Sequence, residues 1–245
     1  IALYICFVLA TTIGLEPYIS VFITAGVLIG LGFLFWRFML LPVLNHSPLI
    51  FFQVGVGLVL VIERILEAIF TPNVQAVPSF ITLNRVFIGA IPIETGYLIA
   101  VLVSLVICIG FYVMLQLTDF GRAIRAVAHC PDTASLMGIN VSQIRFRTLS
   151  LAFVFVAITG ALLAPMWSLR PIMGLHLTLM ALIILIVGGM GHFLGTLIIA
   201  FVIGISQGLG QFYLGGSYAL AIPYGIFILV MFARPQGLFG TRRLE

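Results

Sequence analysis

The stretch Ile183-Ile184-Leu185-Ile186-Val187 is apolar at every position, so no face of it suits contact with water. A strand of a membrane β-barrel alternates apolar and polar residues, which this stretch does not do. The whole chain has the same character, because 62% of its 245 residues are hydrophobic and only 7% are charged. Soluble domains carry about 25% charged residues. We therefore predict an all-α fold, a polytopic bundle of transmembrane helices.

Eight segments approach or reach the length of about 20 apolar residues that a membrane-spanning helix needs. They are Ile1–Ile13, Tyr18–Phe35, Leu49–Ile69, Tyr97–Leu117, Thr148–Leu169, Leu175–Val187, Phe193–Phe212 and Tyr218–Phe232. We predict about eight spans. The segment Leu175–Val187 is too short to cross the bilayer comfortably at a rise of about 1.5 Å per residue. Over residues 175–212 we therefore expect short helices that either extend into full spans or are broken and re-entrant.

The chain begins at Ile1, within an apolar run and without a methionine. We expect residues 1–245 to form a single transmembrane domain, as a fragment that lacks its N-terminal spans. Within the segment Thr71–Ile93, the runs Phe80–Leu83 and Val86–Ile88 flank Asn84 and favour strands. A β-hairpin with its turn at Asn84 and an irregular loop are equally good interpretations of this segment.

The arginines give the orientation, since basic residues of short loops stay in the cytoplasm. All 11 basic residues are Arg. The loop 119–147 and the C-terminal tail have an even number of predicted spans between them, so they lie on one side. Placing both inside puts eight arginines inside, namely Arg37, Arg122, Arg125, Arg145, Arg147, Arg234, Arg242 and Arg243, and three outside, namely Arg64, Arg85 and Arg170. We predict a cytoplasmic C-terminus.

Ionisable residues within the predicted spans are few. Glu63 and Glu67 lie one helical turn apart, with Arg64 beside them, near the predicted outer surface. An interfacial anchor is a better interpretation of this cluster than a gate or a substrate-facing pair. No carboxylate pair, His/Cys cluster or nucleophile–base pair has catalytic spacing. Without lysine the chain also has no phosphate-loop lysine. We expect no catalytic residue, no metal site and no cofactor.

Glycines are concentrated between the predicted spans that begin at Leu175 and Phe193. The set consists of Gly188, Gly189, Gly191, Gly195, Gly204 and Gly208. Small residues four apart let membrane helices approach closely, and glycine also permits the broken helices that line transport paths. We expect helix packing as the main role of this set and the lining of a translocation path as a second role.

The loop 119–147 is the longest polar stretch, and it has the pattern of two short helices. The first, Gly121–Ala128, continues inward from a span and ends at His129-Cys130. Pro131 suits the first turn of the second helix, and Gly138 suits a terminating left-handed residue. A helix of about seven residues is marginal in water. We therefore expect the rest of the protein or a partner to hold it, and the alternative is an ordinary solvated loop.

Three motifs together resemble the permeases of branched-chain amino acid ABC transporters. They are the loop sequence Gly121-Arg122-Ala123 … Ala126-Val127-Ala128 … Asp132–Asn140, the run Gly188-Gly189-Met190-Gly191 … Gly195, and the tail Arg234–Gly240. The similarity covers most of the chain from about Tyr97 onward. The Asn-Phe-Ala-His-Gly run of that family's N-terminal segment is missing.

The resemblance implies a transporter subunit of a bacterial inner membrane rather than an enzyme. In this family two permease subunits pair, two separate ATPases dock beneath them, and an external binding protein delivers the substrate. It also implies a coupling helix in the ATPase groove, formed by Pro131, Asp132, Ala134, Leu136, Met137, Gly138 and Ile139. We expect the substrate to pass beside Leu175–Val187 and Phe193–Phe212. The alternatives are an ABC permease for urea, short amides or simple sugars, a stand-alone secondary transporter, and a structural membrane subunit.

Overall fold

The computed structural model consists almost entirely of helices. It describes residues 1–14, 16–40, 48–70, 77, 85–88, 91–170, 173–189, 191–215 and 220–240. The chain divides into two compact units, Ile1–Pro171 and Ile172–Glu245, and each is described by itself. The single transmembrane domain expected from the sequence stays a prediction.

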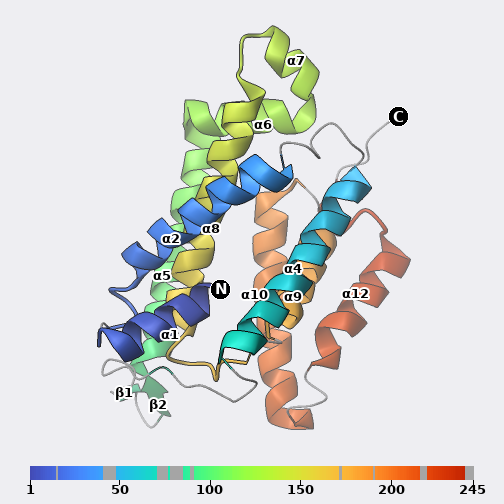
Figure 1. The fold of residues 1–245 in the computed structure, drawn as a ribbon. Helices are drawn as coiled ribbons and strands as arrows, with labels where there is room; N and C mark the ends of the chain where they lie inside the picture. Colours follow the sequence, from blue (N-terminus) through green and yellow to red (C-terminus); the bar gives the residue numbers. More distant parts are fainter. Residues whose placement is uncertain are drawn as a thin grey trace. The chain divides into compact units, whose positions relative to one another are not determined.

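The first unit holds most of the secondary structure (Figure 1). Its elements are α1 (Ala2–Thr12), α2 (Val21–Phe35), the π-helical turn η1 (Trp36–Leu40), α4 (Pro48–Phe70), β1 (Arg85–Ile88), β2 (Ile91–Glu94), α5 (Thr95–Leu117), α6 (Asp119–His129), α7 (Pro131–Leu136) and α8 (Val141–Leu163). The second unit consists of α9 (Met173–Gly188), α10 (Phe193–Leu214) and α12 (Ala221–Ala233).

Each of the eight predicted spans corresponds to one helix, but about eight spans are not confirmed. Among the described residues, four helices are long and apolar enough to cross a membrane: Val21–Phe38, Thr95–Leu117, Val141–Leu163 and Phe193–Tyr213. The helices α1, α9 and α12 are apolar but shorter, with 11, 16 and 13 residues. The helix α4 has 23 residues but contains three charged side chains near its C-terminal end.

Two paired strands follow α4, and the sequence predicted one of them. Strand β1 pairs with β2 in antiparallel register, with Arg85 opposite Glu94 and Ile88 opposite Ile91. The predicted strand Val86–Ile88 is therefore confirmed, and the predicted turn at Asn84 lies outside the described residues. The predicted partner strand Phe80–Leu83 lies outside the described residues. Two residues separate the strands, and two-residue connections are the commonest in hairpins.

In the first unit α8 packs against α1 and α2 at small residues. A Cβ atom on Gly160 of α8 would collide with the Cβ atom of Ala2 on α1. A Cβ atom on Gly32 of α2 would lie 2.5 Å from the ring of Phe153 on α8. Small residues at these crossings allow close helix contact, which is the main source of association for helices in lipid.

In the second unit α9, α10 and α12 enclose a small apolar core. Its buried members are Ile183, Val187, Ile199 and Ile203, and Ile226, Phe227 and Val230 of α12 pack against them. The turn between α9 and α10 is short, so the two helices run antiparallel and contact each other along their length. The predicted short helix at Leu175–Val187 is thus part of a helical hairpin.

Candidate functional site

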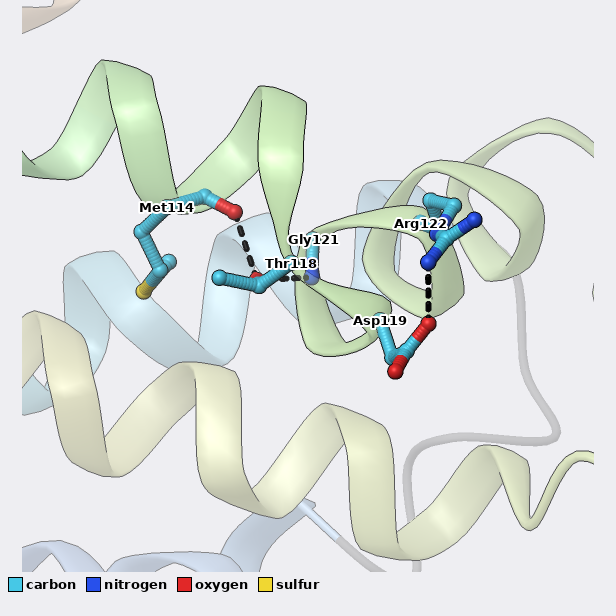
Figure 2. A network of polar contacts seen from close by, with 5 residues as sticks. All are labelled: Met114, Thr118, Asp119, Gly121 and Arg122. Atoms are coloured by element: carbon cyan, nitrogen blue, oxygen red, sulfur yellow. Dashed lines mark hydrogen bonds and ion pairs between the residues drawn. The ribbon is translucent and has the colours of Figure 1, made fainter.

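The polar loop folds into two helices, as predicted, and both lie beyond the end of α5 (Figure 1). Thr118 separates α5 from α6 with an extended backbone. Its hydroxyl donates to the carbonyl oxygen of Met114 at 2.6 Å and accepts from the backbone N–H of Gly121 at 3.1 Å (Figure 2). One side chain therefore adds a second hydrogen bond to the Met114 carbonyl, which also accepts from the Thr118 backbone N–H at 3.2 Å, and satisfies a terminal N–H of α6 that the helix cannot pair internally.

The start of α6 touches the backbone of α5. Gly121 is buried, and a Cβ atom there would lie 2.5 Å from the carbonyl oxygen of Met114 and collide with that of Leu115. The guanidinium of Arg125 donates to the same carbonyl oxygen of Leu115. Arg122, by contrast, is exposed and pairs only locally with Asp119 (Figure 2).

The helix α7 is short but has well-formed ends. Pro131 occupies its first turn, directly after the extended residue Cys130. Gly138 has a φ of +83°, the left-handed conformation predicted from the sequence. Its N–H donates to the carbonyl oxygen of Ser135 at 3.0 Å, and the N–H of Ile139 donates to that of Ala134 at 3.1 Å. This pair of bonds is a Schellman motif, which satisfies the last carbonyls of the helix.

The seven predicted coupling residues lie together in α7 and its C-terminal turn, but they do not share one environment. Ala134 is only 5% exposed, so it faces the protein and holds α7 in place. Leu136 and Met137 are 86% and 79% exposed. Two large apolar side chains therefore project from a helix that the protein anchors on its other side. This distinction between anchoring and projecting residues was not predicted from the sequence.

The loop leads into α8, whose first turn is also capped by a side chain. The side chain of Asn140 accepts a hydrogen bond from the backbone N–H of Gln143 at 3.1 Å. Both α6 and α7 also pack against α8. The loop is therefore a folded platform for α7, and the alternative of an ordinary solvated loop is wrong.

The second candidate site, the glycine-rich turn of the second unit, is tightly packed on itself. A Cβ atom on Gly188 would lie 2.5 Å from Cα of Thr196, and one on Gly195 would lie 2.5 Å from the carbonyl oxygen of Gly188. Gly189 and Gly191 have φ values of +94° and +90°. These four predicted residues form the crossing and the turn between α9 and α10.

The C-terminal tail docks on this turn, a contact that was not predicted from the sequence. Gly237 has a φ of +83°, and a Cβ atom there would lie 2.5 Å from the carbonyl oxygen of Ile186. The N–H of Leu238 donates to the carbonyl oxygen of Val187 at 2.8 Å, which satisfies one of the last carbonyls of α9. A Cβ atom on Gly189 would meet the backbone N of Gly240 at 2.5 Å. The second and third sequence motifs are therefore the two halves of one contact.

The remaining two predicted glycines are not packed against other residues of the described part of the second unit. Gly204 and Gly208 are exposed on α10, and a Cβ atom at either would have no neighbour within 4 Å. They contribute nothing to packing within the described part of the second unit. The predicted set thus divides into four residues that shape the turn and two that lie on an open helix face.

The three charged residues of α4, Glu63, Arg64 and Glu67, also differ in their exposure to solvent. Arg64 and Glu67 form an ion pair of 2.6 Å, and the Arg64 side chain is 76% exposed. An interfacial anchor accounts for these two residues. Glu63 is only 6% exposed, so it does not reach outward with them, and the anchor interpretation is wrong for this side chain.

The helices of these two units define a polytopic helical membrane protein. The chain belongs to the family described as the branched-chain amino acid transport system permease component, whose sequence model matches residues 1–231. This result confirms the resemblance noted above.

Individual relatives are distant but cover much of the chain. The high-affinity branched-chain amino acid transport system permease protein LivH of Salmonella typhimurium is 26% identical over 211 residues, which are 83% of this chain and 68% of LivH. A probable LivH of Methanocaldococcus jannaschii is 31% identical over 58% of this chain and 48% of its own. The ribose import permease protein RbsC of Bacillus subtilis is 32% identical over 49% of this chain and 39% of its own. No solved structure gives a significant match.

Proposed function

We propose that this chain is a membrane-spanning subunit of an ATP-binding-cassette importer for branched-chain amino acids, and that α7 couples it to separate ATPase subunits. The complete transporter would contain a second permease subunit, two ATPases and an external binding protein, in a bacterial inner membrane. The family and the names of the relatives support the substrate class.

The observation that carries the coupling role is the construction of α7. A six-residue helix has little stability of its own. Here both ends are fixed and Ala134 is buried, while Leu136 and Met137 remain exposed. Exposed apolar side chains on a rigid helix suit insertion into a hydrophobic groove of a partner protein. A separate ATPase chain with such a groove is the partner that the family implies.

The orientation follows from the same proposal. The loop 119–147 and the tail would face the cytoplasm, in agreement with the arginine count. The hydrogen bond from Leu238 to Val187 places the α9–α10 turn at the same end of the second unit as the tail. That arrangement supports α9 as a full crossing, although its 16 residues rise only about 24 Å.

We propose that the translocation path lies beside α9 and α10. An apolar amino acid side chain with a zwitterionic head suits an apolar passage that offers backbone dipoles, and broken helices provide such dipoles only where they line a cavity or are buried in protein. The packed glycines of the turn hold α9 and α10 close together. Gly204 and Gly208, on the open face of α10, are therefore the better candidates for lining the translocation path. The buried Glu63 is the competing location.

The test is ATP hydrolysis by the reconstituted transporter, formed from the full-length protein, its ATPases and its binding protein. Leucine, isoleucine or valine should stimulate hydrolysis, whereas ribose should not. Stimulation by ribose alone would favour the sugar-permease alternative, which the similarity to RbsC supports.

A matched pair of variants addresses the role of α7 in the same assay. Leu136→Ala should weaken ATPase binding, and Phe232→Ala on α12, which is 88% exposed and equally apolar, should not. Equal ATPase binding by both variants and the wild type would contradict the coupling role.

A further inference from the structure

We infer that the contact between α5 and α6 is a rigid corner whose residues Thr118, Gly121 and Arg125 position the coupling helix and transmit its movement to α5. These are positioning residues, because they act through α7 rather than by touching a partner or a substrate. The transmission part rests on the proposed function. The rigidity of the corner does not, and it can be measured separately.

The hydrogen bonds of the corner cross from one helix to the next. The last four carbonyls of a helix have no partner within it. Here the carbonyl of Met114 accepts from the Thr118 hydroxyl at 2.6 Å, and that of Leu115 accepts from the Arg125 guanidinium. Arg125 lies ten residues beyond Leu115, on the second turn of α6. The Met114 carbonyl also accepts from the Thr118 backbone N–H at 3.2 Å, so Arg125 is the side chain of α6 that satisfies a terminal carbonyl of α5.

Gly121 allows the start of α6 to approach the backbone of α5 closely. The Cβ of any other residue would meet the carbonyl oxygens of both Met114 and Leu115. These are backbone atoms of a helix, so they cannot move aside as a flexible side chain would. Two hydrogen bonds across the corner and a backbone contact between them fix the angle between α5 and α6.

From the corner, a continuous folded path leads to α7. Val127 on α6 is buried, and the single extended residue Cys130 separates α6 from Pro131. The buried side chain of Ala134 then fixes α7 on the same platform. A force applied to α7 therefore reaches the end of α5 without passing through a long linker.

The opposite end of that path is α5, one of the four candidate membrane spans among the described residues. The helix α5 spans Thr95–Leu117, and none of its most apolar window is buried within the described residues. Besides the corner, α5 packs against α8, where the ring of Phe111 lies 5.0 Å from that of Phe155. The corner holds the end of α5 that faces α6 and α7, so a displacement of the corner would move that end of a candidate membrane span.

The same substitution at two arginines of α6 distinguishes the loss of the corner hydrogen bond from the loss of a positive charge. Arg125→Gln removes the guanidinium from the Leu115 carbonyl, whereas Arg122→Gln removes only an exposed ion pair. Gly121→Ala pushes α6 away from α5. The geometry is measured in the full-length protein without native cysteines, between spin labels at Ser104→Cys on α5 and Thr133→Cys on α7, both exposed positions.

The wild type and Arg122→Gln should give one narrow distance distribution. Gly121→Ala and Arg125→Gln should give a broadened or displaced distribution at unchanged helix content. An unchanged distribution in both corner variants would overturn the inference, whatever the transporter does.

A second measurement tests transmission in the assembled transporter. Gly121→Ala and Arg125→Gln should still bind the ATPases through an intact α7, but substrate should no longer stimulate ATP hydrolysis. Arg122→Gln should retain that stimulation. Normal stimulation in corner variants that have broadened distances would overturn transmission and leave the proposed function standing. A wild-type chain that binds no ATPase would instead overturn the proposed function and transmission together, while the distance result would still decide the rigidity.

Discussion

The substitution Gly237→Ala tests the docking of the C-terminal tail on the α9–α10 turn. Gly237 has a φ of +83°, and its Cβ would lie 2.5 Å from the carbonyl oxygen of Ile186 and 2.8 Å from Cα of Gly189. The left-handed conformation costs an L-residue about 1–2 kcal/mol. Overpacking against rigid atoms costs about 1–3 kcal/mol more. We therefore expect a penalty of about 3 kcal/mol, which the protein avoids by releasing the tail.

The release can be measured by amide hydrogen exchange. The N–H of Leu238 is bonded to the carbonyl oxygen of Val187 at 2.8 Å, so docking protects it. A loss of about 3 kcal/mol corresponds to exchange about 100-fold faster, provided that local opening limits exchange. Peptides from the core of the first unit should exchange at the wild-type rate.

Two control variants distinguish the conformational cost of a positive φ from the cost of steric contact. Gly191→Ala has a φ of +90° but open space around its Cβ, so it should carry the conformational cost alone and leave Leu238 protected. Gly225→Ala lies in α12 with no neighbour within 4 Å and should be neutral or stabilising by up to about 1 kcal/mol. Wild-type exchange at Leu238 in the Gly237→Ala variant would refute the docking of the tail.

Further predictions concern orientation and the transport path. In a background without native cysteines, Ser135→Cys and Thr241→Cys should react with an impermeant thiol reagent in inverted vesicles and not in intact cells. Labelling of Ser135→Cys from outside would overturn the orientation. His192→Cys, in the α9–α10 turn, should react from the same side as Thr241→Cys, and opposite sides would exclude α9 as a full crossing. Gly204→Leu should reduce uptake per folded molecule while Glu63→Gln should not, and the reverse result would move the path to α4.

Local signals made the two helices of the loop 119–147 predictable from the sequence. Pro131 and Gly138 bound α7 because a proline fits the first helical turn and a glycine adopts a positive φ at low cost. Neither argument needs any knowledge of the rest of the fold. The eight apolar segments were recognised as helices for a similar reason, since their composition alone excludes contact with water.

Contacts between distant segments were not predictable in this way. The tail meets the α9–α10 turn across about 50 residues, and only the glycines on both sides hinted at a close approach. The burial of Ala134 and of Glu63 depends on neighbours that one sequence does not identify. The pairing of Val86–Ile88 with Ile91–Glu94 was not predicted, although Gly89 between them is a turn signal comparable to Asn84.

The central claim is that α7 docks into an ATPase, and photo-crosslinking tests it most directly. The full-length protein without native cysteines would carry Leu136→Cys or Met137→Cys, modified with a thiol-specific photo-crosslinker, and would be irradiated with its ATPases. A control at Tyr213→Cys, an exposed position on α10, reports random encounters. The account predicts an ATPase adduct from both positions of α7 and none from position 213. No adduct from either α7 position, with the ATPases bound to the same complex, would contradict it.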